Sequence, residues 1–366
     1  MKTPVNGIIR IHGKPFDYFK LGKSFSKGRP FMDYMGRTAQ TLMAKANTQK
    51  AISNVKQCPI CRSSKNQPVL MRYGFIYRQC MAPLCRHVFV ANRVKDKIRN
   101  LFFSQNSQYS KKNYCDSKIS EFRIKEIATP KVEFVMNYVN KGANSWLDVG
   151  CGSGEILFVL KEKKWNAVGL ELGSGDVEFA KYTYGVDVRQ ATLEDFVKEN
   201  NKKFDVISFF GVVHCVPDPN QLIQGAATLL KPGGILVIEI PHHDSVEFSA
   251  IKTFPKRPSR SCYNGLVTLH HFTEKSTQRL LSQANLKSEL VWYFGTDIFE
   301  LLNQWSYAQK GFIDSALQKQ LLQLANDLQQ VIDQRERSSN MVWIARKQAS
   351  WNKNQTSNKL VTAKIA

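Results

Sequence analysis

Residues Trp146–Gly154, with the sequence WLDVGCGSG, contain the strongest structural signal in the chain. An apolar strand ends here in a glycine-rich turn, and a helical pattern follows at about 156–161. Glycines at such a turn let the backbone bend sharply and pass close to a ligand. A dinucleotide-binding turn needs glycines at i, i+2 and i+5, but here they stand at 150, 152 and 154 and are followed by an acidic residue. The turn therefore favours a cofactor that places no phosphate on it.

A second carboxylate follows at a distance that is typical of nucleoside-binding folds. Glu171 ends the next predicted strand, 23 residues after Asp148. A carboxylate at this position can accept hydrogen bonds from both hydroxyl groups of a ribose. The glycine turn and Glu171 together predict a nucleoside cofactor without phosphates.

The chain around this turn alternates between short apolar strands and helical segments. This alternation predicts an α/β fold with a parallel, doubly wound sheet. After Pro241, a helix is expected near 275–284, and two further strands bracket a helical insertion at 295–340. Six apolar residues of this insertion fall on one helical face and predict core packing; they are Leu317, Leu321, Leu324, Leu328, Val331 and Ile332. The predicted strands are Ser145–Val149, Ala167–Glu171, Val186–Arg189, Phe204–Phe210, Gly234–Ile240, Glu289–Phe294 and Met341–Ala345.

The glycine turn and three further motifs resemble the class I S-adenosylmethionine (SAM)-dependent methyltransferases, which have a Rossmann-like, seven-stranded fold. QATLEDF at 190–196 is similar to the loop that faces adenine in this family. FDVISFF at 204–210 resembles the fourth strand, and LLKPGGILVI at 229–238 resembles the turn and the fifth strand. The resemblance implies an enzyme that uses SAM as its methyl donor.

The same resemblance assigns roles to individual residues. Asp148 would contact the amino end of the methionine, and Glu171 would hold the ribose. The remaining cofactor residues would be Gly150, Gly152 and Gly154 along the cofactor, Thr192 and Leu193 beside the adenine, and Phe210 and Gly211 beneath the sulfonium. The alternative is a non-catalytic, zinc-dependent binding protein whose methyltransferase domain has degenerated.

Four cysteines form two pairs in the N-terminal third. Cys58 and Cys61 are followed, after 18 intervening residues, by Cys80 and Cys85. Two such pairs can supply four thiolates in tetrahedral geometry, as in a structural zinc ribbon. His87 is a spare candidate ligand, and the alternative is a redox pair or unrelated buried thiols.

A zinc ribbon that precedes a methyltransferase domain resembles one bacterial subgroup, whose members modify sugars, quinone-like molecules or other secondary metabolites. RHVFVAN at 86–92, LHHFT at 269–273 and MVWIARK at 341–347 extend this resemblance over about 58–347. The first 57 residues match no known pattern.

Histidines are the candidate general bases, because an acceptor hydroxyl must lose a proton and histidine titrates near neutral pH. Ligands of parallel sheets bind at the carboxyl ends of the strands. His214 follows the fourth strand, His242 and His243 follow the fifth, and His270 and His271 lie beyond the next loop. The family often has acidic residues and a histidine after the fourth strand, whereas this chain has glycine, histidine and cysteine at 211, 214 and 215. The insertion is expected to cap the acceptor pocket, with Tyr109 and Tyr114 on its other side.

The net charge of +22 is concentrated in one third of the chain. Residues 1–120 contain 23 basic and 4 acidic residues, whereas residues 121–366 contain 29 and 26. This excess favours an anionic partner. One hypothesis is a small anionic acceptor such as a sugar or a related metabolite. A second is an RNA methyltransferase that docks RNA through the basic region.

No apolar run is long enough to span a bilayer, and the N-terminus lacks the pattern of a secretory signal. Eight cysteines, four of them with metal spacing, favour a reducing compartment, so we expect a cytoplasmic protein. The expected organisation is a basic, aromatic arm of loops or short strands at 1–57, a zinc ribbon at 58–92, a helical connector at 93–130, a methyltransferase domain at 131–348 and a polar tail at 349–366.

Overall fold

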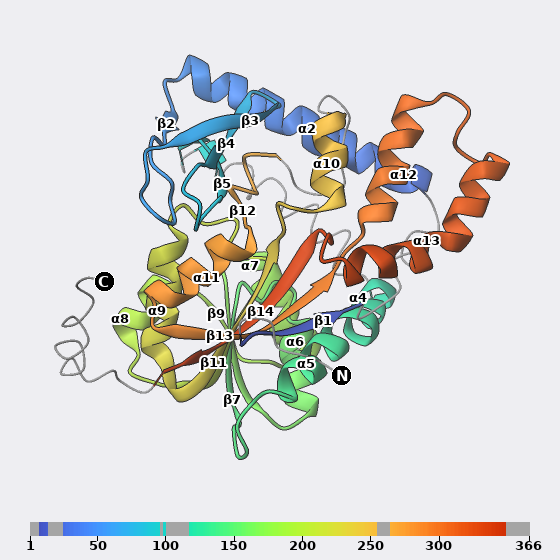
Figure 1. The fold of residues 1–366 in the computed structure, drawn as a ribbon. Coiled ribbons are helices and arrows are strands. Elements are labelled where there is room, and N and C mark those ends of the chain that lie inside the picture. Colours follow the sequence, from blue (N-terminus) through green and yellow to red (C-terminus); the bar gives the residue numbers. More distant parts are fainter. Residues whose placement is uncertain (1–6, 14–24, 96–97, 100–116, 255–263, 349–366) are drawn as a thin grey trace, which may run out of the picture.

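The structure is a computed structural model that describes residues 7–13, 25–95, 98–99, 117–254 and 264–348. An eight-stranded sheet with the order β1-β13-β14-β11-β10-β7-β8-β9 lies at its centre (Figure 1). β14 is antiparallel to both of its neighbours, and the other neighbouring pairs are parallel. The strands are β1 (Ile9–His12), β7 (Ser145–Val149), β8 (Asn166–Glu171), β9 (Val188–Gln190), β10 (Phe204–Phe210), β11 (Leu230–Pro241), β13 (Leu286–Phe294) and β14 (Asn340–Lys347). The α/β fold expected from the sequence is confirmed, and β1 adds an eighth strand to the seven predicted.

Helices cover both faces of this sheet. On one face, α5 (Thr129–Met136) and α6 (Glu155–Glu162) bury apolar side chains such as Val132 and Leu160. On the other face, α8 (Leu193–Glu199), α9 (Pro219–Leu229) and α11 (Glu274–Gln283) do the same. α4 (Ser117–Arg123) and the π-helical turn Ile124–Ala128 precede α5, and α7 (Ser174–Phe179) and the π-helical turn Ala180–Tyr184 follow β8.

The first described strand, β1, joins the main sheet through both backbone and side-chain contacts. It pairs in parallel with β13, from Ile9 opposite Leu290 to His12 opposite Tyr293. Arg10 on this strand is 15% exposed and forms ion pairs with Glu274 (2.7 Å) and Glu336 (2.6 Å). Part of the predicted N-terminal arm is therefore built into the edge of the main sheet.

The expectation of loops or short strands throughout residues 1–57 is wrong for 25–48, which form the helix α2 (Phe25–Thr48). Its apolar side chains Ala39, Leu42, Met43 and Ala46 are buried against a second, smaller sheet. Gly28 and Gly36 lie within this helix, and a glycine inside a helix costs about 1 kcal/mol relative to alanine. Burial of several apolar side chains outweighs this cost, and only the folded chain supplies the surface that buries them.

The smaller sheet has the order β12-β5-β4-β3, and of the four clustered cysteines Cys80 lies on it, at the end of β4. Its strands are β3 (Asn66–Arg72), β4 (Phe75–Cys80), β5 (Val88–Val90) and β12 (His270–His271), and β2 (Ile52–Asn54) pairs separately with β6 (Asn92–Val94). We call residues 52–94 the cysteine module. Its paired strands extend beyond the predicted bounds of 58–92, and β12 reaches it from the segment after β11.

The predicted helical insertion between the last two strands of the chain is present. It consists of α12 (Asp297–Ala308) and α13 (Ala316–Gln334), and α12 packs against α10 (Val246–Thr253). That it caps an acceptor pocket stays a prediction. Tyr109, Tyr114 and residues 349–366 lie outside the described residues. Among the helices that the structure describes, none is long and apolar enough to cross a membrane.

The apolar stripe of α13 packs only in part as predicted: Leu321 and Ile332 are partly buried against an apolar cluster of the insertion, whereas the other four side chains are not. Leu317, Leu324, Leu328 and Val331 are 39–55% exposed. The buried face of the helix contains Gln329, whose Nε2 donates to Asp297 Oδ2 (3.0 Å) and to Asp333 Oδ1 (2.8 Å). Buried polar groups that find hydrogen-bond partners are tolerated inside a protein, so the helix turns a polar face inward.

We expect Arg10→Met to lower the free energy of unfolding by about 1–3 kcal/mol, because it leaves two partly buried carboxylates without their partner. Urea unfolding followed by circular dichroism measures this change. The control is Lys198→Met, which removes an exposed ion pair with Glu194 and should leave stability as it is. An equal effect of the two variants would show that β1 is not held by Arg10.

Candidate active site and candidate metal centre

The three glycines after β7 have backbone conformations that other residues rarely adopt. Their φ angles are +72° at Gly150, +52° at Gly152 and +89° at Gly154. A Cβ atom at Gly150 would lie 2.4 Å from Val212 Cγ2. One at Gly154 would lie 2.7 Å from Ala180 Cβ, in the π-helical turn that follows α7. A Cβ at Gly152 would meet no atom within 4 Å. The outer two glycines therefore allow close packing, whereas Gly152 borders open space.

Glu171, at the carboxyl end of β8, connects this strand to the glycine turn. Its Oε2 accepts a hydrogen bond from the backbone N–H of Gly152 (3.0 Å). Its Oε1 accepts from the backbone N–H groups of Leu172 (2.7 Å) and Gly173 (2.9 Å). The carboxylate is thus held at the border of the open space beside Gly152.

Asp148 lies near the carboxyl end of β7 and is almost completely buried. Its Oδ1 accepts a hydrogen bond from Ser208 Oγ (2.6 Å), and Ser208 Oγ in turn accepts from Trp146 Nε1 (2.7 Å). Burial raises the pKa of Asp148 to about 7. A cationic ligand group beside it would favour the ionised form.

The other predicted cofactor residues follow the next two strands. Thr192 caps α8, because its Oγ1 accepts from the backbone N–H of Asp195 (3.0 Å), and Leu193 is buried. Phe210 is half-buried at the end of β10, and Gly211 is exposed, with a φ of +80°. The predicted set therefore gathers at the carboxyl ends of β7, β8, β9 and β10. An open glycine, a fixed carboxylate and a buried acid at this edge fit a nucleoside cofactor with a cationic end.

Sequence reasoning missed two ion pairs near this edge. Arg123 from α4 donates to the buried carboxylate of Glu155 (2.6 Å) at the start of α6. Lys131 from α5 pairs with Glu239 of β11, and its Nζ lies 5.2 Å from the ring centroid of Phe210. Glu239 is the one acidic residue within the apolar run of β11, and that interruption was the available signal.

Among the three candidate bases, His214 lies next to the predicted methyl-transfer position. A Cβ at Gly211 would be 4.0 Å from His214 Cε1. Burial lowers the pKa of His214 to about 4, so the imidazole is neutral near pH 7. Its Nδ1 is buried and has no hydrogen-bond partner within the described part of the chain.

The other two candidates are buried among different groups. His242 Nδ1 lies 3.0 Å from the carbonyl oxygen of Ser338, which requires a proton on Nδ1 and gives this histidine a structural contact. The His243 ring packs on Phe248, with centroids 4.2 Å apart, and burial lowers its pKa to about 4. His243 Nδ1 also has no partner among the described residues. His214 and His243 therefore each have an Nδ1 atom that accepts or donates no hydrogen bond within the described part of the chain.

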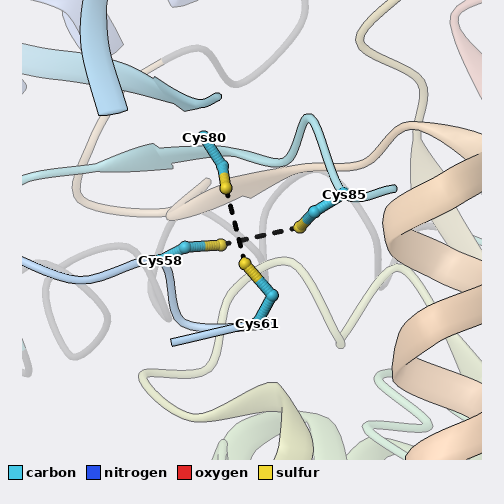
Figure 2. Close-up of side chains that lie close together, drawn as sticks. All are labelled: Cys58, Cys61, Cys80 and Cys85. Carbon is cyan, nitrogen blue, oxygen red and sulfur yellow. Dashed lines mark hydrogen bonds between the residues drawn. The ribbon is translucent and has the colours of Figure 1, made fainter. Parts of the chain in front are cut away.

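The four cysteines of the module converge on one point (Figure 2). Their sulfur atoms all lie within 4.8 Å of one another, with Cys58 and Cys85 3.7 Å apart and Cys61 and Cys80 3.4 Å apart. A hydrogen bond from Cys85 lowers the pKa of the Cys58 thiol to about 6. Four thiols in such a cluster are the donor set of a closed, structural zinc site. His87 stands outside the cluster, since its Nε2 lies 2.9 Å from His270 Nδ1.

Comparisons with known proteins agree with this geometry. A family model described as "Methyltransferase domain" matches residues 118–291. The ubiquinone biosynthesis O-methyltransferase of Stutzerimonas stutzeri is 29% identical over 143 residues, which are 37% of this chain and 57% of that protein. The protein of the same name from Actinobacillus pleuropneumoniae is 33% identical over 115 residues, which are 28% of this chain and 49% of that protein. The chain thus spans about half the length of these curated relatives.

Solved structures of methyltransferases are also similar to the chain. A SAM-dependent methyltransferase from Archaeoglobus fulgidus has 18% sequence identity and a TM-score of 0.42, and the match covers 66% of this chain and 98% of that chain. The plantazolicin methyltransferase BpumL has 16% identity and a TM-score of 0.44, with 69% and 94% covered. The chain has a Rossmann-like α/β fold by its own strand order, and its residues 118–291 match the methyltransferase-domain model.

Proposed function

We propose that this protein transfers a methyl group from SAM to a hydroxyl oxygen of a small-molecule acceptor. One observation carries the proposal: the glycine turn, with Gly152 open to a ligand, is hydrogen-bonded to Glu171 at the carboxyl edge of the sheet. The matched relatives are named O-methyltransferases of ubiquinone biosynthesis, which supports oxygen as the accepting atom.

The residues at this edge have distinct proposed roles. When bound, SAM supplies an electrophilic methyl group on a positively charged sulfur. Glu171 accepts hydrogen bonds from the ribose hydroxyls, and Asp148 pairs with the ammonium group of the methionine part. The rest of the proposed cofactor site is formed by Gly150, Gly152 and Gly154, by Thr192 and Leu193 near the adenine, and by Phe210 and Gly211 beneath the sulfonium. These groups mainly align the donor with the acceptor, and alignment supplies much of the rate in a displacement of this kind.

His214 is the proposed general base, with His243 as the second choice and His242 as the third. The neutral His214 imidazole takes the proton of the acceptor hydroxyl while the oxygen–methyl bond forms and the sulfur–methyl bond breaks. The position of His214 beside Gly211 supports this role. So does its Nδ1 atom, which has no hydrogen-bond partner among the described residues. The Nδ1 contact of His242 with Ser338 argues against a primary role for that residue.

The acceptor class is inferred from the relatives and from charge. A hydroxylated, quinone-type ring follows from the relatives' names, whereas a sugar or another anionic metabolite follows from the basic N-terminal third. We place the ring compound first, because the relatives' names indicate a chemical class, whereas the charge of the N-terminal third indicates only an anion.

An acceptor screen with radiolabelled SAM tests the proposal directly. Label should pass to at least one hydroxylated ring compound or sugar and form an O-methyl product identified by mass spectrometry. Bulk RNA is included as a third arm across a salt series. Transfer to RNA alone, with an affinity that falls steeply as salt rises, would overturn the small-molecule proposal.

Matched variants assign the roles in the same assay. Glu171→Ala should weaken SAM binding about tenfold or more, because it removes an acceptor for the ribose. His214→Asn should leave SAM binding unchanged and lower kcat by about 10²-fold or more, the usual contribution of a general base. If His214→Asn keeps full kcat while His243→Asn loses it, the base is His243.

The affinity for SAM should depend on pH because Asp148 has a raised pKa of about 7. Below pH 7 the carboxyl is protonated before binding, and pairing with the ammonium group must release that proton. Affinity should therefore fall about tenfold for each pH unit between 7 and 5.5, and it should level off above pH 7. Isothermal titration calorimetry measures this change. Asp148→Asn should bind weakly with a flat profile, and an equally steep profile in that variant would exclude Asp148 as the titrating group.

We also propose that Cys58, Cys61, Cys80 and Cys85 bind one structural zinc ion. The convergence of four thiols without another described ligand supports this proposal. Such a metal would stabilise a module that is too small to fold on its own apolar core.

Elemental analysis of protein purified without added metal should find about one zinc ion per chain. Cys80→Ser should reduce that content to less than half, whereas Cys151→Ser, which changes a cysteine of the glycine turn, should retain it. A metal-free wild-type protein that remains folded would refute the zinc site.

A further inference from the structure

The segment that follows β10 is held by groups from outside it. We call residues 211–218, between β10 and α9, the post-β10 loop, and it includes His214. Four consecutive carbonyl oxygens of this loop accept hydrogen bonds from other parts of the chain. That of residue 214 accepts from the backbone N–H groups of Leu269 (2.8 Å) and His270 (3.2 Å), and that of residue 215 accepts from Arg99 Nη2. The carbonyls of residues 216 and 217 contact His270 Nε2 (3.0 Å) and Arg93 Nη1 (2.7 Å).

Two of these donors belong to the sheets of the cysteine module. Arg93 lies on β6, and His270 lies on β12, which pairs antiparallel with β5 through His270–Phe89 and His271–Val88. The backbone N–H of Val90 also donates to the carbonyl of Leu269 (2.9 Å), directly before β12. The post-β10 loop therefore rests on an edge of the module sheet.

The hydrogen bonds of the His270 side chain have a defined direction. The carbonyl oxygen of Val216 can only accept, so at 3.0 Å His270 Nε2 carries the proton. Arg93 Nη2 also lies 3.4 Å from this nitrogen, but that contact is not a hydrogen bond in this tautomer, because both groups are donors. His270 Nδ1 is then the acceptor, and His87 Nε2 donates to it across 2.9 Å.

This chain of donors begins beside the cluster of four cysteines and ends at the loop. His87 follows Cys85 by two residues, and the carbonyl of Cys85 also accepts from Thr273 Oγ1 (2.7 Å), just after β12. Both rings, His87 and His270, are fully buried and lie with centroids 5.1 Å apart. Side chains buried this completely hold a loop more firmly than exposed ones, because water cannot replace their hydrogen bonds.

We propose that His270, oriented by His87, is a positioning residue that fixes the post-β10 loop, and that the cysteine module thereby sets the position of His214. The inference rests on the proposed function, since it treats His214 as the base. In this view the module contributes no reacting group. It acts by supplying hydrogen-bond donors to the carbonyl oxygens of residues 214, 216 and 217 of the loop.

The test compares two replacements of His270. His270→Leu removes the donor to Val216, whereas His270→Gln retains an amide N–H near the same position. In His270→Leu, amide hydrogen exchange of residues 212–218 should be about tenfold faster and kcat about tenfold lower, as expected for the loss of one such bond. The affinity for SAM and the zinc content should not change. His270→Gln should restore both exchange and kcat to within about threefold of wild type.

Further variants keep the proposal falsifiable. Arg93→Met removes the donor to Pro217 and should also speed exchange in the loop, so it decides the question if His270→Leu does not fold. Met71→Ala, a change at a side chain that is 71% exposed on the same sheet, is the matched control and should behave as wild type. If His270→Leu folds and its amide exchange and kcat are unchanged, the proposal is overturned. If it does not fold, unchanged exchange and kcat in Arg93→Met overturn the proposal instead. If wild-type protein methylates no acceptor, the proposed function fails, but the exchange measurement still decides this inference.

Discussion

The contact between the Gly152 amide and the Glu171 carboxylate joins the ends of two adjacent parallel strands. It requires a left-handed backbone at Gly152 and a carboxyl group at the last position of β8. Parallel strands present their carboxyl ends at one edge, so the glycine turn, Asp148 and the post-β10 loop all lie at the edge where this contact is made. Every proposed catalytic role depends on that edge.

A second dependence connects the small sheet to the large one. β12 lies between two strands of the methyltransferase domain in sequence, yet it pairs with β5 of the cysteine module. The module therefore cannot be regarded as a separate domain attached to the N-terminus of an enzyme. The smaller sheet includes β12, which belongs to the segment beside the proposed acceptor site. Through this strand the cysteine module is connected to that site.

Much of the fold and of the candidate site could be predicted from local patterns. Seven of the eight strands of the main sheet, the glycine turn and the cysteine pairs were recognisable because period, spacing and residue type are properties of short segments. The helix α2 and the outward stripe of α13 could not be predicted correctly. Their environments depend on surfaces such as the small sheet beside Met43 and the buried Asp297 beside Gln329, which come from distant parts of the chain.

The sequence by itself determined the fold class, the kind of cofactor turn and the four thiols, because each is encoded within a few neighbouring residues. Only the tertiary structure decided which histidines keep a free nitrogen and which residues hold the post-β10 loop. His242, His214 and His270 look alike in the sequence, but their surroundings differ. Ser338 engages the first, burial leaves Nδ1 of the second without a partner among the described residues, and His87 and Val216 hold the third. The physical reason is that hydrogen bonding and desolvation act between groups that only folding brings together.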